Sequence, residues 1–468
     1  MKLGRNIAFL WRWVRTGVLA GLLAGSVLLY RWSRVGDPRF YRFLETNTGR
    51  RMAVVFQWYG DNPSPPPDDL DESRMTPEEQ EVKRRLEAQV RADLPTHELL
   101  FEDGQTLTGR VTEERRDEVV FVRTYGDSAE VTAVIPRRRL QSIRRLEMPD
   151  PGITYRDVRF QMEFPDLRYY RRPPFSLLTD ESFFRVEQTV ELLEILHEQF
   201  VEVWRGVMAG ERPDRSIQVL FFSRQEAFRE YQRKYAPRLE STAGFYSPRL
   251  DRLVLFNQRA SDRVADLRQQ LETEEARHRS AATSPAAQAR LREWRMQMEG
   301  DIERFAETQT RTTIRHEGAH QLFYDLGIHS RHGIEGEWLI EGMATYCETS
   351  PIGAADPARL RSLRRALEEG SLIGLEDLVN LRDKSGLMSF GVQERIGLAY
   401  DQAWGLVRFL MQPNYRQAFF DYLRYLRNPE NFGEIRRLGE LAMLCRFLVL
   451  DPDELWRRWT EYILQTSG

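Results

Sequence analysis

The pattern of hydrophobic and polar positions divides the chain into an apolar N-terminal segment, a region of short strand-like runs and a long part with helical periodicity. Residues 17–30 are apolar and are flanked by Arg15 and Arg31. This length is short for a spanning helix and typical of a signal-peptide core. We expect residues 1–36 to be an uncleaved membrane anchor, with the remaining chain extracytoplasmic because basic residues precede the anchor. Two alternatives stay open: a cleaved signal, which leaves a secreted or periplasmic protein, and a core helix in a cytoplasmic protein.

Residues 37–95 are expected to form a linker that contains one helix. Pro63 and Pro65–Pro67 lie among acidic residues, which predicts a stiff, extended segment. Thr76 followed by Pro77 and two Glu residues is typical of a helix start, since it combines a capping hydroxyl, a proline at the first position and carboxylates in the first turn. We expect this helix to end near Asp93.

Residues 96–150 show short runs of alternating residues separated by turn signals. The predicted strands cover about 99–101, 107–111, 119–122, 131–135 and 140–146. Their spacing predicts a small SH3-like or Sm-like β-barrel. Basic residues at 137–139 and 144–145 could contact anionic lipid or an acidic envelope partner, or they could only protect a strand edge from pairing.

Residues 151–468 combine strands with many helices and predict an α+β domain with a mixed sheet and a helical C-terminal lobe. Strands are expected at 175–178 and 217–222, and a hairpin at 243–256. Helices are expected from a cap at Asp180 to about 207, and then at 225–235, 357–370, 392–412, 414–427 and 434–465, the last with a break at Asp451–Pro452. Residues 259–307 are highly charged and are expected to form a helical-hairpin insertion, which could be a lid, a partner surface or a spacer.

The composition excludes some classes of protein. The formal net charge is −3, with both signs well mixed, so nothing indicates a nucleic-acid-binding protein. Cys347 and Cys445 are the only cysteines and form neither a disulfide framework nor a zinc pair.

The strongest chemical signal is the HExxH run His316-Glu317-Gly318-Ala319-His320. Residues four apart lie on one face of a helix, so the imidazoles of His316 and His320 can bind one metal ion. Glu317 can reach the open side of that metal, where a general base would activate a zinc-bound water. The alternative is a helix that exposes two His residues and a Glu to solvent.

A catalytic zinc needs a third protein ligand. Metzincins supply a His six residues after the second His, but Leu326 stands at that position. The run Trp338-Leu339-Ile340-Glu341-Gly342-Met343-Ala344-Thr345-Tyr346 resembles the WLxEGxAxY stretch of gluzincins. The layout is also similar to that of bacterial peptidase-MA-like domains, over roughly residues 170–468. This resemblance implies that His316, His320 and Glu341 hold one Zn²⁺ per chain.

The same resemblance suggests further site residues. Glu348 lies seven residues after Glu341, and in the aminopeptidase branch a Glu at this offset hydrogen-bonds a ligand His; the alternative is a solvated carboxylate. His329 and His332 could compete as ligands, but their surroundings predict a loop. One strand of the 243–256 hairpin is the candidate to pair with the substrate backbone; the alternative is that it is only a member of the sheet.

Tyr400 begins a Tyr-x-x-Ala stretch on a predicted helix, and the resemblance implies that its hydroxyl stabilises the oxyanion. The alternative is a buried tyrosine that hydrogen-bonds within the core. Tyr246 and Tyr346 are weaker substitutes for this role.

The expected function is therefore that of an exported, membrane-tethered zinc peptidase acting on peptides or proteins, with Glu317 as general base. The Gly-Ala-Met-Glu-Asn-like motif with which aminopeptidases bind the substrate amino terminus does not occur, which favours an endopeptidase. The alternatives are a non-catalytic zinc-containing binding module of the cell envelope and a zinc hydrolase of non-peptide amides.

Overall fold

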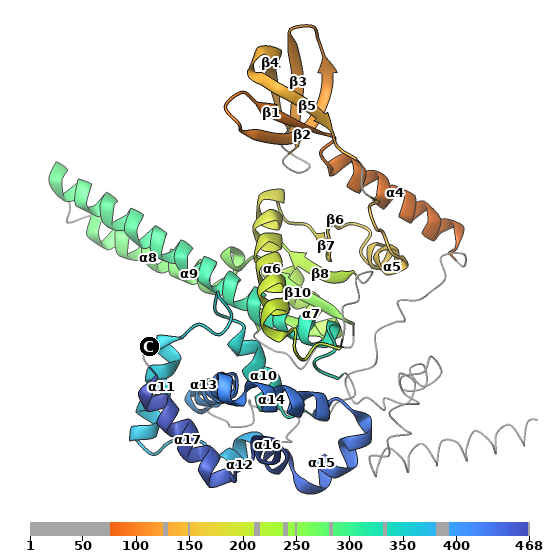
Figure 1. Cartoon of the computed structure of the whole chain (residues 1–468). Coiled ribbons are helices and arrows are strands. Elements are labelled where there is room, and N and C mark those ends of the chain that lie inside the picture. Colours follow the sequence, from red (N-terminus) through yellow and green to blue (C-terminus); the bar gives the residue numbers. More distant parts are fainter. Residues whose placement is uncertain are drawn as a thin grey trace, which may run out of the picture.

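The computed structural model describes residues 75–124, 130–147, 150–209, 216–236, 242–248, 250–279, 284–330, 335–380 and 393–466. The expected anchor at residues 1–36 and the proline-rich segment lie outside the described residues. Within these ranges, no helix has both the length and the hydrophobicity needed to cross a membrane. The described chain contains many helices and two five-stranded sheets, so the expected α+β class is confirmed (Figure 1).

Helix α4 (Pro77–Asp93) has the predicted bounds. The Thr76 hydroxyl accepts a hydrogen bond from the Glu79 N–H, and the Glu79 carboxylate accepts one from the Thr76 N–H. This capping box satisfies two backbone donors at the start of the helix. Leu86 and Val90 of α4 are buried in one hydrophobic cluster with residues of the larger sheet. The domain boundaries at residues 37, 96 and 151 stay predictions.

The smaller sheet follows α4 and confirms the five predicted strands. They are β1 (His97–Phe101), β2 (Thr106–Glu114), β3 (Glu118–Thr124), β4 (Glu130–Pro136) and β5 (Leu140–Arg145), with the 3-10 helix η2 (Arg137–Arg139) between the last two. The strand order is β4-β3-β2-β1-β5, with antiparallel neighbours throughout. Leu99, Phe121 and Ile135 form its small core. Figure 1 shows this sheet beyond the end of α4, apart from the larger sheet.

The larger sheet contains β6 (Arg168–Arg172), β7 (Phe175–Thr179), β8 (Ile217–Phe222), β9 (Gly244–Ser247) and β10 (Arg252–Phe256), in the order β6-β7-β8-β10-β9. The central strands β7, β8 and β10 are parallel, and β6 and β9 pair antiparallel at the edges. Strand β6 and helix α5 (Tyr155–Glu163) were not predicted from the sequence.

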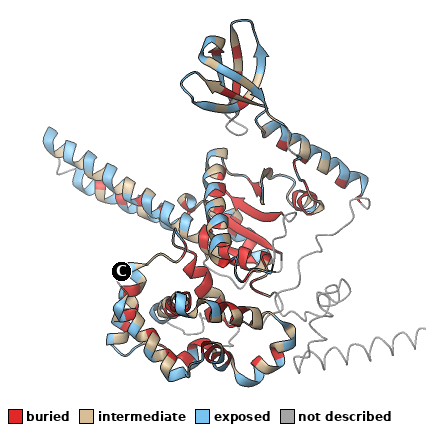
Figure 2. Cartoon of the chain, in the orientation of Figure 1, coloured by how far each residue is buried: buried red, intermediate tan, exposed pale blue. Residues whose placement is uncertain are grey.

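The central strands are buried on both faces, which explains their nearly continuous apolar runs (Figure 2). Along β8, Val219 and Phe221 lie in the cluster on one face, whereas Leu220 and Phe222 lie in the cluster on the other. Helix α6 (Phe183–Trp204) covers the first face, and α4, α5 and α7 (Gln225–Tyr235) contribute to the second cluster. This two-sided burial fixes the strand register, because a shift of one residue would exchange the two faces.

The expected cap of α6 at Asp180 is wrong. The helix begins after Ser182, and the Asp180 carboxylate accepts hydrogen bonds from the N–H and hydroxyl of Ser223 instead. Asp180 therefore joins the start of α6 to the end of β8 and does not cap the helix.

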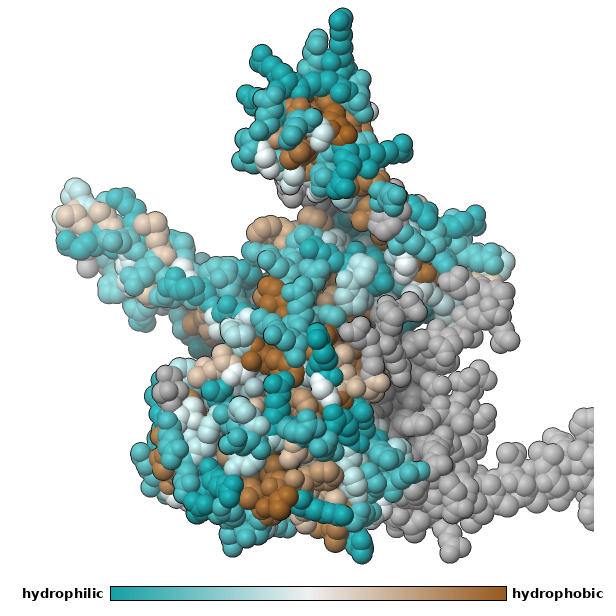
Figure 3. Space-filling view, in the orientation of Figure 1, coloured by the Kyte–Doolittle hydropathy of each residue, from teal (hydrophilic) through white to brown (hydrophobic). Residues whose placement is uncertain are grey.

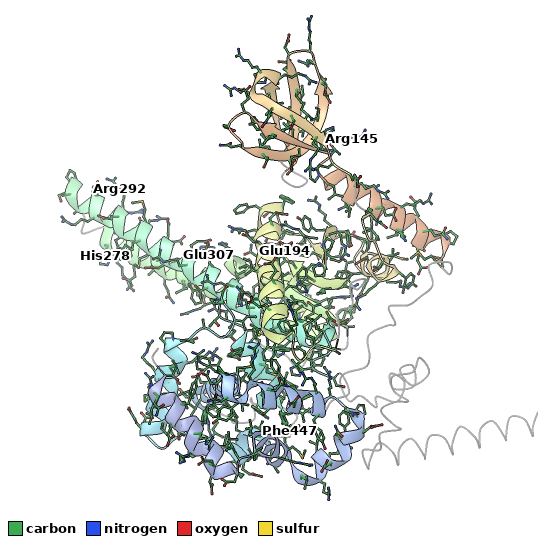
Figure 4. The ribbon with its side chains drawn as sticks, viewed as in Figure 1. Arg145, Glu194, His278, Arg292, Glu307 and Phe447 are labelled. Atoms are coloured by element: carbon green, nitrogen blue, oxygen red, sulfur yellow. The ribbon has the colours of Figure 1, made fainter. Side chains whose placement is uncertain are left out.

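The charged segment 259–307 forms a helical hairpin, but it has no boundary with the helix that carries the HExxH run. It includes most of η3 (Gln258–Ala260), the whole of α8 (Asp262–Arg279) and the first part of α9 (Pro285–Asp325), a 41-residue helix that continues beyond the segment into the HExxH run. Figure 3 shows a mostly hydrophilic surface on this hairpin. In Figure 4, His278 and Arg292 lie towards its tip and Glu307 lies nearer the body. The helix that carries the HExxH run is therefore continuous with one arm of the α8–α9 hairpin.

The C-terminal part is helical, as predicted. It contains α10 (Glu337–Tyr346), α11 (Pro357–Glu368), α12 (Leu375–Val379), α13 (Gln393–Leu410), α14 (Pro413–Leu426), η5 (Pro429–Asn431), α15 (Phe432–Leu438), α16 (Glu440–Leu448) and α17 (Pro452–Gln465). The expected single helix before Asp451 is wrong, because Gly439, at φ 88°, separates α15 from α16. Helix α12 was not predicted.

We expect Gly342→Ala to destabilise the protein by roughly 1–3 kcal/mol, because an added methyl group overfills a packed contact. A Cβ at Gly342 would lie 2.7 Å from the Ala403 carbonyl oxygen and 3.0 Å from Val407 Cγ2, where α10 packs on α13. Gly397→Ala on α13 is the matched control, since a Cβ there meets nothing within 4 Å. Urea denaturation of both variants measures the difference. A free energy of unfolding of Gly342→Ala equal to or greater than that of the wild type would contradict the close packing of α10 on α13.

Candidate metal centre

Helix α9 brings the two histidines of the HExxH run together. His316 Nε2 and His320 Nε2 lie 3.3 Å apart, and their side chains are only 15% and 10% exposed. The helix ends after Asp325 because Gly327 turns the chain in the left-handed region, at φ 66°. The two imidazoles therefore lie near the C-terminal end of a long, well-packed helix.

Helix α10 supplies a third donor to the same point. Glu341 Oε2 lies 3.2 Å from His316 Nε2 and 3.7 Å from His320 Nε2. Ligands of a tetrahedral zinc at about 2.0–2.1 Å lie about 3.3 Å from one another. The three donor atoms therefore have the separations and the chemistry that a single zinc ion requires. Among the described residues, the side chains of His316, His320 and Glu341 form a group that could hold a metal ion.

A carboxylate orients the first histidine. Glu348 Oε1 lies 2.9 Å from His316 Nδ1, so the ring can donate to Glu348 and direct Nε2 towards Glu341. The expected helical position of Glu348 is wrong, because α10 ends at Tyr346 and Cys347 is its cap. Glu348 reaches His316 from the turn that follows the helix.

Arg315 holds this turn in place. Its buried guanidinium donates hydrogen bonds to the carbonyls of Cys347 and Thr349, the residues on either side of Glu348. The same side chain donates to Gln199 of α6. Burial lowers the pKa of Arg315, but carbonyl and amide oxygens accept hydrogen bonds from its Nε and Nη2 groups. Arg315, the residue before His316, thus fixes the backbone on both sides of the carboxylate that contacts the His316 ring.

The charges of the donors are strongly coupled. Burial favours the neutral imidazole of His316, but hydrogen bonds with Glu341 and Glu348 outweigh it and raise the pKa of His316 well above its usual value. Burial alone would raise the pKa of Glu341, but His320 and His316 lower it below the usual range. Without metal, the site is therefore an imidazolium–carboxylate pair.

Glu317 lies on the side of α9 that faces the larger sheet. Its Oε2 accepts a hydrogen bond of 3.0 Å from the Tyr246 N–H in β9. Burial raises the pKa of Glu317, while the adjacent imidazoles of His316 and His320 act to lower it. A carboxylate with a raised pKa is a better proton acceptor than an ordinary one.

Of the three tyrosines considered from the sequence, Tyr400 of α13 faces the donors. Burial raises its pKa, and so does its interaction with Glu341. The hydroxyl therefore stays protonated and is a hydrogen-bond donor. The Tyr246 hydroxyl donates to Asp251 at 2.7 Å, and Tyr346 is buried against Trp204, so neither has the same position.

His329 is buried close to the centre but does not belong to the donor group. Its ring packs on Phe323 and Tyr324, and its backbone N–H donates to the Phe323 carbonyl. Burial lowers the pKa of His329 to about 3, so the ring is neutral. The other alternative ligand, His332, lies outside the described residues.

We expect zinc binding at pH 7 to release about one proton, because the raised pKa of His316 leaves it protonated and a zinc ligand must be neutral. The apparent affinity should then fall by about tenfold for each pH unit below the pKa of His316. Titration calorimetry in two buffers with different ionisation enthalpies measures the protons released. Identical binding heats in both buffers would contradict the protonated state of His316.

Residues 310–431 match a family described as "Protein of unknown function (DUF1570)". The matched segment contains the three donors, Glu317, Glu348 and Tyr400, but not β9. No curated protein matches the chain. The described centre is thus contained in the matched segment, apart from the contact that β9 makes with Glu317.

Proposed function

We propose that the protein is a zinc-dependent peptidase in which His316, His320 and Glu341 hold one Zn²⁺. The observation that carries the proposal is the separation of their three donor atoms, between 3.2 and 3.7 Å. A purely structural zinc site usually has four protein ligands, whereas a catalytic site keeps one position open. The bound ion would supply Lewis acidity for the scissile carbonyl and would lower the pKa of a water molecule.

The roles of the other residues follow from their positions. Glu317, next to the donors and with a raised pKa, would accept the proton of the attacking water and deliver it to the leaving amine. Tyr400, whose raised pKa keeps its hydroxyl protonated, would donate a hydrogen bond to the oxyanion of the tetrahedral intermediate. Glu348 would hold the His316 ring in one tautomer and orientation.

Strand β9 supports a gluzincin-like arrangement. It lies at the edge of the larger sheet, and its Tyr246 N–H contacts Glu317. An extended substrate could add to this edge as a further strand, which would place a peptide bond beside Glu317. Because binding along a strand does not require a free amino terminus, this arrangement favours an endopeptidase.

The remaining parts of the proposal concern location and partners. The sequence of residues 1–36 supports a membrane anchor with the peptidase outside the cytoplasm. The five-stranded antiparallel sheet with a 3-10 turn before its last strand is compatible with an SH3-like barrel. This module, or the α8–α9 hairpin, would contact an envelope partner.

We expect Glu317→Gln to retain about one zinc per chain but to lose turnover by a factor on the order of 10²–10⁴, because the amide cannot accept a proton. Two quantities would be measured for each protein. Mass spectrometry would follow the peptides released from a mixture of protein substrates, and metal analysis would give the zinc content per chain. Glu293→Gln, an exposed position on the same helix, is the matched control.

Glu341→Ala should instead lose the zinc. Zinc bound by the wild type without cleavage of any peptide would favour the alternative, a non-catalytic zinc-containing binding module. Absence of zinc from metal-replete wild-type protein would contradict both functions.

We expect Tyr400→Phe to reduce kcat by about 10²–10³-fold with little change in KM, because the hydroxyl is needed mainly in the transition state. Tyr346→Phe is the matched control and should leave kcat unchanged, since Tyr346 packs in the core away from the donors. Steady-state kinetics on one peptide substrate separate the two constants. A loss confined to KM would assign Tyr400 to substrate binding instead.

A further inference from the structure

One arginine outside the donor group connects two parts of the centre. Arg359, in the first turn of α11, donates from Nη2 to Glu348 Oε2 at 2.7 Å and from Nη1 to Asp401 Oδ1 at 2.7 Å. Glu348 is the carboxylate that contacts the ligand His316, and Asp401 is the neighbour of Tyr400 on α13. The guanidinium therefore connects Glu348, which contacts the proposed ligand His316, to α13, the helix that carries Tyr400.

The bridge is shielded from solvent. The side chains of Arg359, Glu348 and Asp401 are 22%, 14% and 15% exposed, so water screens their attraction much less than it screens a surface pair. The Glu348 carboxylate uses one oxygen for His316 and the other for Arg359. Without Arg359, this carboxylate would keep its contact with His316 but lose the partner that fixes its rotation.

The position of Arg359 is itself fixed by the local fold. Asp356 caps α11 by accepting hydrogen bonds from the backbone N–H groups of Ala358 and Arg359. Asp356 Oδ2 also lies 3.6 Å from Arg359 Nε. Arg359 thus faces three carboxylates and projects from an anchored first turn, which restricts the freedom that a long side chain would otherwise have.

The planar fork of arginine is required for this geometry. Two separate nitrogens of one guanidinium reach, at the same distance, Glu348 in the turn after α10 and Asp401 on α13. A lysine ammonium is a single point charge on a flexible stem and cannot reproduce both contacts in the same arrangement. Lysine would therefore preserve the charge but not the bridge.

We propose that Arg359 is a positioning residue that orients His316 through Glu348 and fixes α13, with Tyr400, through Asp401. This inference rests on the proposed zinc function. It assigns to one guanidinium the relative placement of a metal ligand and of the group that contacts the oxyanion. Neither Glu348 nor Asp401 has another basic side chain as a hydrogen-bond partner among the described residues apart from Arg359 and, for Glu348, His316.

The test measures metal binding by the full chain with zinc alone and then with Co²⁺ as a spectroscopic probe. We expect Arg359→Gln to weaken zinc binding by about 10-fold in competition with a chelating dye, the lower end of the effect of removing a direct partner of a ligand, because Arg359 acts on His316 through Glu348. The visible spectrum of the Co²⁺ form should change as well, because the orientation of His316 changes. Arg359→Lys should recover only part of the affinity. Arg361→Gln, which removes an exposed charge from the same helix, should match the wild type.

The outcomes separate this inference from the proposed function. Wild-type affinity and an unchanged Co²⁺ spectrum in Arg359→Gln would overturn the role of Arg359 while leaving the zinc site intact. A lower melting temperature of the metal-free variant with unchanged affinity would also overturn it, since that result describes a merely structural residue. Failure of the wild type itself to bind zinc would refute the proposed function. If Arg359→Gln does not fold, Arg359→Lys decides, and full wild-type affinity in that variant would overturn the bridge.

Discussion

The centre depends on the close approach of α10 to two helices at once. Gly342 lets α10 pack against the backbone of α13 at Ala403, because any side chain at that position would overlap the carbonyl oxygen. The residue before it, Glu341, is thereby held between the imidazoles of α9 and the hydroxyl of Tyr400. Gly342 therefore makes the close helix contact and its neighbour Glu341 supplies the donor atom, so a looser contact between α10 and α13 would move Glu341 away from the imidazoles.

Burial determines how this group of charges behaves. Two carboxylates, of Glu341 and Glu348, and the imidazole of His320 each lie within hydrogen-bonding distance of the His316 ring, in a largely solvent-excluded place. Desolvation of charge is costly, so such a group is stable only when each member is paired. Arg315 and Arg359 complete the pairing around Glu348, one through the backbone and the other through the carboxylate. The arrangement holds the donors in place before any metal binds, which is the condition for a well-defined site.

Several features were predictable because they depend on local chemistry. The capping box at Thr76, the alternating strands and the HExxH periodicity each involve residues within a few positions, and the structure places them as expected. The predictions were wrong where a side chain has its hydrogen-bond partner far away in the sequence. Asp180 resembles a helix cap but bonds to Ser223, and α10 ends before Glu348 although the spacing from Glu341 fits a helix. In both cases a tertiary contact replaced the local alternative.

The sequence by itself indicated which side chains could bind a metal. Four-residue spacing on a helix is a local property, and the Trp-Leu-x-Glu-Gly context of Glu341 resembles that of the third ligand in gluzincins. The sequence could not determine the supports of those donors. Arg315 and Arg359 look like ordinary charged helix residues, and their partners lie at sequence distances that no short pattern encodes. The choice among Tyr246, Tyr346 and Tyr400 also required the tertiary structure. Only the packing of α9, α10, α11 and α13 decides which polar groups meet, because their meeting is a property of helix contacts and not of any single segment.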